Sequence, residues 1–267
     1  MLALIERIAP EYLAKKAYKA LSEPKVKKLR EHEQAVLKAS RKSSLKFKHF
    51  DIQRYTWGFG PKHVLLVHGW EGQAGNFSAL IPILVDGGYT VHAFDAPSHG
   101  NSTQAKTSLF DYSEVVTMIL NERNYETIIT HSFGSVPLTL ALSEKDSYPL
   151  NRLMLITTPD RFEDRLAQIL GELKLTMRTG NRVIEKLKKQ TGKDPLSMSV
   201  GKFCEDIRPN HSMILHGEND KVLPMEWSER ISKVLPNCHL QTIPDTGHYR
   251  ILYDKRTQEI LAEFIRR

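Results

Sequence analysis

The sequence has few cysteines, no long apolar run and no pattern that binds a metal or a nucleotide. Its only two cysteines, Cys204 and Cys238, offer neither a disulfide framework nor the spacing of a metal site. No stretch approaches the roughly 18 apolar residues that a membrane-spanning helix requires. Charge follows the N-terminus too early for a secretory signal, at Glu6 and Arg7. These absences predict a cytoplasmic protein that needs no metal or cofactor.

Positive charge is concentrated in the first part of the chain. The formal net charge is +7, but residues 1–50 carry 13 Lys/Arg and 5 Asp/Glu, whereas the remaining 217 residues carry 25 and 26. A nucleic-acid channel would spread basic residues around the site. No P-loop follows a predicted strand. We therefore expect neither nucleic acid nor a nucleotide as the ligand.

The basic segment reads as a helical extension over residues 1–43. Apolar residues recur at helical spacing on both sides of Pro24, where the pattern breaks. A basic amphipathic helix can lie on an anionic membrane surface. The stripe is rich in alanine and lacks Trp or Phe, which favours docking on the protein body and leaves weak peripheral membrane contact open. The first stripe consists of Ile5, Ile8, Tyr12, Leu13, Ala17, Ala20 and Leu21, and the second of Val26, Leu29, Val36 and Leu37.

From residue 44 onwards the pattern predicts a mostly parallel, doubly wound α/β sheet of about eight strands. Alternating residues from Leu45 to Trp57 indicate two short antiparallel strands. Apolar runs separated by helix-sized segments then follow, which is typical of buried parallel strands. The runs are Val64–Val67, Thr90–Phe94, Thr127–Ile129, Leu153–Ile156, Met213–Leu215 and His239–Ile243.

One connection between predicted strands is too long to be a simple loop. About fifty residues after Thr157 lack any strand pattern, and they contain two helical stripes, around Leu166 and around Ile184. We predict a helical cap over residues 158–209. It divides the body into a first part, 44–157, and a second part, 210–267.

Ser132 is the candidate nucleophile. It follows the run Ile128-Ile129-Thr130 and precedes a small-residue turn and a predicted helix, an arrangement that exposes a serine hydroxyl to a base. Gly134 leaves room for a close approach of the neighbouring chain. The pattern departs from G-x-S-x-G, because Thr130 stands where the first glycine is expected.

The candidate acid and base follow the last two predicted strands. Asp220 lies a few residues beyond a strand end, from where a carboxylate can orient an imidazole, and Glu218 is the alternative. His248 follows Gly247 and is the candidate base. The chain order Ser132, Asp220, His248 is that of one particular fold.

Backbone N–H groups of Trp70 and Phe133 are the candidate oxyanion hole, since Gly69 ends a strand and allows the chain to turn there. His68, Asp95 and His99 are predicted to be structural. They lie at the ends of predicted strands, where such residues more often hold the backbone in place by hydrogen bonds than take part in catalysis.

The sequence resembles the α/β-hydrolase family from about Ser44 to Arg267. The resemblance rests on five motifs in family order: H-G-W at 68–70, D-x-P-x-H-G-x-S at 95–102, x-H-S-x-G ending at Gly134, H-G-x-x-D at 216–220 and G-H at 247–248. It implies the α/β-hydrolase fold with a cap after the sixth strand, and a cofactor-free serine hydrolase.

The expected activity is cleavage of small to medium acyl esters or thioesters by a Ser132-His248-Asp220 triad. Two alternatives stay open: a C–C bond hydrolase or perhydrolase with the same triad, and a slow or inactive small-molecule sensor. The sequence assigns neither the substrate-binding residues nor the oligomeric state.

Overall fold

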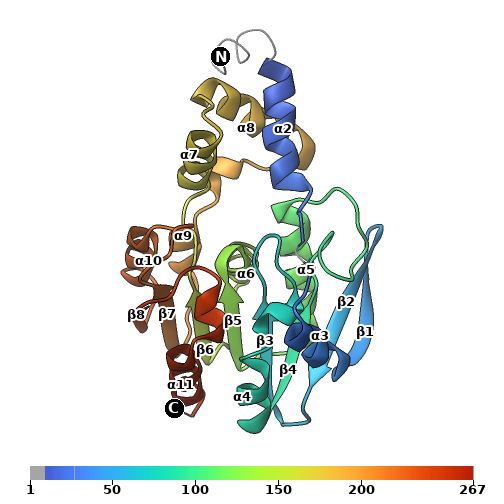
Figure 1. Ribbon diagram of the computed structural model, residues 1–267, viewed down its shortest axis with the longest axis vertical. Helices are drawn as coiled ribbons and strands as arrows, with labels where there is room; N and C mark the ends of the chain where they lie inside the picture. Colours follow the sequence, from blue (N-terminus) through green and yellow to red (C-terminus); the bar gives the residue numbers. More distant parts are fainter. Residues whose placement is uncertain (1–9, 27, 267) are drawn as a thin grey trace.

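The computed structural model describes residues 10–26 and 28–266, and its centre is one eight-stranded sheet (Figure 1). The strand order is β1-β2-β4-β3-β5-β6-β7-β8. β2 pairs antiparallel with both β1 and β4, and all the other neighbouring strands are parallel. The prediction of a mostly parallel eight-stranded sheet is confirmed. The strands are β1 (Arg41–Phe47), β2 (Phe50–Trp57), β3 (Lys62–Val67), β4 (Tyr89–Phe94), β5 (Thr127–His131), β6 (Arg152–Ile156), β7 (His211–Gly217) and β8 (Cys238–Ile243).

Both faces of the sheet are buried because successive side chains of each strand point to opposite faces. Leu65 and Ile128 belong to the core on one face, and Leu66 and Ile129 to the core on the other. Burial on both faces explains why the strands are apolar without interruption. The first core packs against α5 (Leu109–Glu122), α6 (Ser135–Ser143), α9 (Val200–Cys204) and α10 (Met225–Ser232); the second packs against η1 (Ala74–Phe77), α4 (Ile81–Asp86), η4 (Arg250–Tyr253) and α11 (Lys255–Phe264).

The long connection between β6 and β7 is helical. It contains α7 (Phe162–Glu172), α8 (Met177–Thr191), the short η3 (Pro195–Ser197) and α9. Leu166, Leu170 and Val183 are buried where α7 and α8 meet, whereas Val200 and Cys204 of α9 belong to the core of the body. α7 and α8 therefore form a small core of their own, and α9 returns the chain to the sheet.

The N-terminal segment contains two helices that dock at different places. α2 (Pro10–Ser22) lies along α8, where Ala14 joins the small core and the Lys186 ammonium lies 4.6 Å from the Tyr18 ring centre. α3 (Glu31–Lys38) docks on the body, with Leu37 in the core and the Val36 carbonyl accepting a hydrogen bond from the Trp57 indole at 2.9 Å. The segment thus connects the α7–α8 pair to the sheet.

The first predicted stripe is only partly correct. Leu13 is buried, but Tyr12 is 65% exposed, because adjacent positions on a helix cannot share the narrow face that α8 covers. Ile5 and Ile8 lie outside the described residues. The four-part division of the chain stays a prediction.

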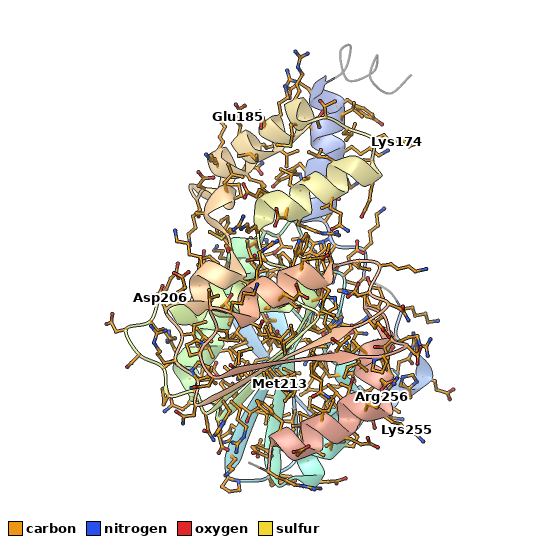
Figure 2. All side chains as sticks on the ribbon, turned by 90° about the vertical axis from the view of Figure 1, so that its left-hand side faces the viewer. Lys174, Glu185, Asp206, Met213, Lys255 and Arg256 are labelled. Carbon is orange, nitrogen blue, oxygen red and sulfur yellow. The ribbon has the colours of Figure 1, made fainter. Side chains whose placement is uncertain are left out.

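Two views agree on how the helices are placed. Figure 1 shows α2, α7 and α8 grouped at one end, beyond the sheet. Figure 2 shows Lys174 and Glu185 at that end, and Lys255 and Arg256 at the opposite end on α11. No helix within residues 10–26 and 28–266 is long and apolar enough to cross a membrane.

Candidate active site

The candidate residues come from loops that follow three parallel strands at one edge of the sheet. Ser132 follows β5, Asp220 follows β7 and His248 follows β8. These strands run parallel, so their carboxyl ends meet at the same edge, where open α/β sheets bind ligands. The fold therefore brings Ser132 and His248 together across 116 positions of sequence.

A chain of hydrogen bonds joins the three side chains. His248 Nε2 lies 2.9 Å from Ser132 Oγ, and His248 Nδ1 lies 2.8 Å from Asp220 Oδ2. The backbone N–H groups of Val222 and Leu223 donate to Asp220 Oδ1 at 2.7 and 2.9 Å. Both carboxylate oxygens are thus held in place, and the imidazole is held by the carboxylate.

The alternative acid does not take part in this chain. Glu218 is exposed, and its Oε2 accepts a hydrogen bond of 3.4 Å from the backbone N–H of Asp245. The structure therefore places Asp220, and not Glu218, beside the candidate base.

The electrostatics of Asp220 suit this role. Burial by itself would raise the pKa of the Asp220 carboxyl, but the hydrogen bond from His248, the electrostatic interaction with His248 and the two backbone N–H donors together hold that pKa below its ordinary value. The carboxylate stays ionised at neutral pH. The nitrogen that faces it carries the imidazole proton, which leaves the lone pair of Nε2 directed at the Ser132 hydroxyl.

Ser132 sits in a sharp turn between β5 and α6. Its φ of +52° lies in the left-handed region that non-glycine residues rarely adopt. A Cβ atom on Gly134 would lie 2.4 Å from the Val67 carbonyl oxygen and 2.5 Å from that of His68. Only glycine at position 134 lets the turn pack this closely against the end of β3.

Thr130 does not prevent the turn from forming. It is still a residue of β5, paired with Val67 and Leu155, and its side chain is fully buried. The Thr130 hydroxyl has no hydrogen-bond partner among the described residues. The left-handed residue is two positions later, so a β-branched side chain fits at 130 as it fits elsewhere in a strand.

His131 is a further residue of this site whose contact with His248 sequence reasoning missed. Its Nε2 lies 2.8 Å from the backbone carbonyl oxygen of His248, to which it donates, and the two rings are 5.1 Å apart. Burial, and then the neighbouring His248, lower the pKa of His131 to about 3. The ring is therefore neutral, and it ties the loop of the base to the strand of the nucleophile. The sequence feature that could have indicated this contact is the position of His131 next to Ser132 in the motif.

His68 and His99 are structural, as predicted. His68 Nδ1 donates to the Gly69 carbonyl at 2.7 Å, and its Nε2 accepts from the N–H of Ala96 at 2.9 Å. His99 Nδ1 donates to the Pro97 carbonyl at 2.9 Å. Burial lowers the pKa of His68 to about 4 and, with a contribution from His68, that of His99 to about 3. Neither ring lies in the hydrogen-bonded chain of Ser132.

Asp95 is structural as well. Its carboxylate accepts three hydrogen bonds of 2.8 Å, from the Tyr55 hydroxyl and from the backbone N–H groups of Ala74 and Asn101. Burial raises the pKa of this carboxyl despite these donors. Asp95 fastens the loops after β3 and β4 to β2 beneath the site.

The two amides predicted to form the oxyanion hole lie close to the nucleophile. A Cβ atom on Gly69 would lie 3.0 Å from Ser132 Cβ and 3.5 Å from the Phe133 nitrogen, so the chain entering Trp70 runs against the turn. The Trp70 and Phe133 rings are 5.3 Å apart. The role of the two N–H groups stays a prediction.

A cavity of about 550 Å³ opens beside Ser132 between the sheet and the α7–α8 pair. Its walls come from the body, from the helical connection and from the N-terminal segment. Apolar side chains dominate the part below α7. The lining includes Leu21, Trp70, Ser132, Phe133, Val136, Phe162, Leu166, Ile169, Leu173, Met198, His248 and Tyr249. In the described part of the chain, no group of three or more His, Cys, Asp or Glu side chains could hold a metal ion.

A family model described as "Alpha/beta hydrolase family" matches residues 64–263. The chain belongs to the α/β-hydrolase family. This confirms the resemblance and, together with the sheet, the predicted fold.

Three similar proteins share low sequence identity with this α/β hydrolase. The uncharacterized hydrolase YugF of Bacillus subtilis is 20% identical over 77% of this chain and 89% of its own. A bromoperoxidase structure from Bacillus anthracis superposes with a TM-score of 0.66 at 20% identity, covering 85% of this chain and all of its own. A putative lipase structure from Acinetobacter baumannii gives 0.66 at 16% identity, covering 90% and 98%. Such likenesses show the fold alone.

The packing of Gly134 leads to the first testable prediction. Gly134→Ala should lower the free energy of unfolding by about 1–3 kcal/mol, because backbone carbonyls block the added methyl group. Gly171→Ala in α7 is the matched control. Nothing lies within 4 Å of its Cβ position, so it should be neutral or slightly stabilising. Urea titration measures both, and equal values for the two variants would contradict the close approach.

Proposed function

We propose that this protein hydrolyses carboxylic esters or thioesters of small to medium acyl chains, with Ser132 as nucleophile, His248 as base and Asp220 as orienting acid. The observation that carries the proposal is the hydrogen-bonded chain Ser132–His248–Asp220 at the floor of an apolar cavity. A serine becomes a useful nucleophile when a positioned base accepts its proton, and the base is most effective when a third group orients it.

The first half of the reaction transfers the acyl group to Ser132. Ser132 Oγ attacks the carbonyl carbon as its proton passes to His248 Nε2, and Asp220 stabilises the imidazolium that forms. The carbonyl oxygen becomes an oxyanion. His248 then returns the proton to the departing alkoxide or thiolate as the bond to the carbonyl carbon breaks.

The N–H groups of Trp70 and Phe133 are proposed to hold that oxyanion. Each donor in such a hole contributes on the order of 3 kcal/mol to the stability of the transition state. The proximity of Gly69 to Ser132 supports this assignment, because it brings the chain that follows β3 against the turn at Ser132.

The second half of the reaction releases the acid. Water attacks the acyl carbon, His248 accepts its proton, and Ser132 leaves with that proton. One water molecule is consumed for each ester cleaved, and the enzyme returns to its starting state.

The helical connection is proposed to act as the cap of the acyl site. Phe162, Leu166 and Ile169 of α7 line the cavity together with the nucleophile. An acyl chain placed there would exchange contact with water for contact with apolar side chains, at about 0.8 kcal/mol for each buried methylene. The cavity volume would then limit the chain length that gains from burial.

The first activity test uses p-nitrophenyl esters from acetyl to palmitoyl. We expect turnover that rises with chain length to an optimum and then falls, since the cavity that α7 helps to line has a limited volume. Ser132→Ala should abolish this turnover while its circular dichroism stays that of the native protein. Activity retained in Ser132→Ala would contradict the mechanism. Absence of turnover with every ester would instead favour C–C bond hydrolysis, perhydrolysis or a binding role.

The choice between the two carboxylates gives a second test. Asp220→Asn should reduce kcat by about 10⁴, because the amide supports the wrong imidazole tautomer. Glu218→Gln removes the same charge two residues away and should leave kcat within about twofold. The pair is assayed on the best p-nitrophenyl ester. A larger loss in Glu218→Gln than in Asp220→Asn would contradict the assignment.

A further inference from the structure

A second groove lies beside the candidate active site, between the N-terminal segment and the body. Its volume is also about 550 Å³. Its walls are the chain before α3, α3 itself, the start of β1 and the loops after β3 and β4. The lining residues are Val26, Lys28, Leu29, Gln34, Leu37, Lys38, Lys42, Gln73, Gly100, Asn101 and Gln104.

The charge of this groove has one sign. Lys28, Lys38 and Lys42 line it, and no carboxylate of the described part of the chain does. Within residues 10–26 and 28–266, none of the three ammonium groups takes part in an ion pair, although Lys46 and Lys48 nearby are paired with Asp51 and Asp111. Three ammonium groups around one hollow repel one another and attract an anion. An anion bound in the hollow would offset their mutual repulsion.

The amide side chains of the groove are already engaged in the protein's own hydrogen bonds. Gln34 Nε2 donates to the Leu29 carbonyl at 2.9 Å, and Asn101 Nδ2 donates to the Tyr55 hydroxyl at 2.8 Å. These bonds fix the walls and leave the lysines as the mobile donors. Lysine binds phosphate oxygens as a point charge and needs no fixed fork geometry.

The groove adjoins the catalytic cavity. Lys28 and Gln73 line both hollows, so a ligand that reached from Ser132 to the groove would pass these two side chains. The basic surplus of the first 50 residues therefore supplies cations to the wall of the site, although the body that holds Ser132 has no surplus.

We propose that this groove binds the phosphate groups of the substrate, which is an acyl ester or thioester whose alcohol or thiol portion is phosphorylated. The inference rests on the proposed function. A small phosphorylated molecule fits better than an anionic membrane surface, because the lysines line an open groove that adjoins the cavity of the nucleophile and shares Lys28 and Gln73 with it.

The test compares two thioesters with the same acyl group. One is the acyl-coenzyme A, which carries phosphates, and the other is the acyl-pantetheine, which carries none. The wild-type protein should show a lower KM for the coenzyme A thioester, and added salt should reduce this difference because it screens the charges. In Lys38→Gln/Lys42→Gln the ratio of the two kcat/KM values should fall by about tenfold or more.

Lys15→Gln/Lys16→Gln is the matched control. It removes the same two charges from exposed positions of α2 outside the groove, so the ratio should stay that of the wild type. Thermal unfolding checks that both double variants are folded. Equal KM values for the two thioesters in the wild type, or a ratio unchanged in Lys38→Gln/Lys42→Gln, would overturn the inference.

A binding experiment separates this inference from the proposed catalysis. Ser132→Ala is titrated with coenzyme A by calorimetry, with and without the Lys38→Gln/Lys42→Gln changes. Lysine-dependent binding supports the groove even if no ester is ever cleaved. No binding, or lysine-dependent sedimentation with phosphatidylserine vesicles in place of coenzyme A binding, would refute it. The catalytic proposal is tested separately, by the turnover of p-nitrophenyl esters, which carry no phosphate.

Discussion

The left-handed backbone of Ser132 is the constraint on which the rest of the site depends. A non-glycine residue with φ of +52° carries strain of about 1 kcal/mol or more, which persists only where the surrounding structure imposes it. Here the end of β3 presses against the turn. A methyl group on Gly134 would collide with the carbonyl oxygens of Val67 and His68, and one on Gly69 would lie only 3.0 Å from Ser132 Cβ. The strain points the Ser132 hydroxyl at His248 and not back into the strand.

The geometry of the base is then fixed from two directions. Asp220 holds the imidazole through Nδ1, and His131 holds the backbone carbonyl of His248 from the strand that carries Ser132. The N-terminal segment has a comparable effect at a larger scale, because α2 packs on α8 while α3 packs on the body. One segment thus spans the cavity, and it contributes Leu21 and Lys28 to its wall.

The features that could be predicted from the sequence are those that depend on local residue patterns. Uninterrupted apolar runs located the strands, since both faces of the sheet are buried, and motif order located Ser132, Asp220 and His248. The pairing of α2 with α8 could not be predicted from the sequence. The two amphipathic stripes lie about 160 positions apart, and an amphipathic pattern shows that a helix buries one face but not which element covers that face. The same limit hid the contact of His131 with His248 and the groove that Lys38 and Lys42 share with the loop around Asn101.

The most direct test of the central claim is covalent labelling with a fluorophosphonate, located by peptide mass spectrometry. We expect one adduct, on Ser132, because among residues 10–26 and 28–266 only this serine has a base directed at its hydroxyl within an open cavity. His248→Ala should lose the adduct under the same conditions. An adduct on another serine, or labelling of Ser132 that persists unchanged in His248→Ala, would contradict the claim that this turn presents an activated nucleophile.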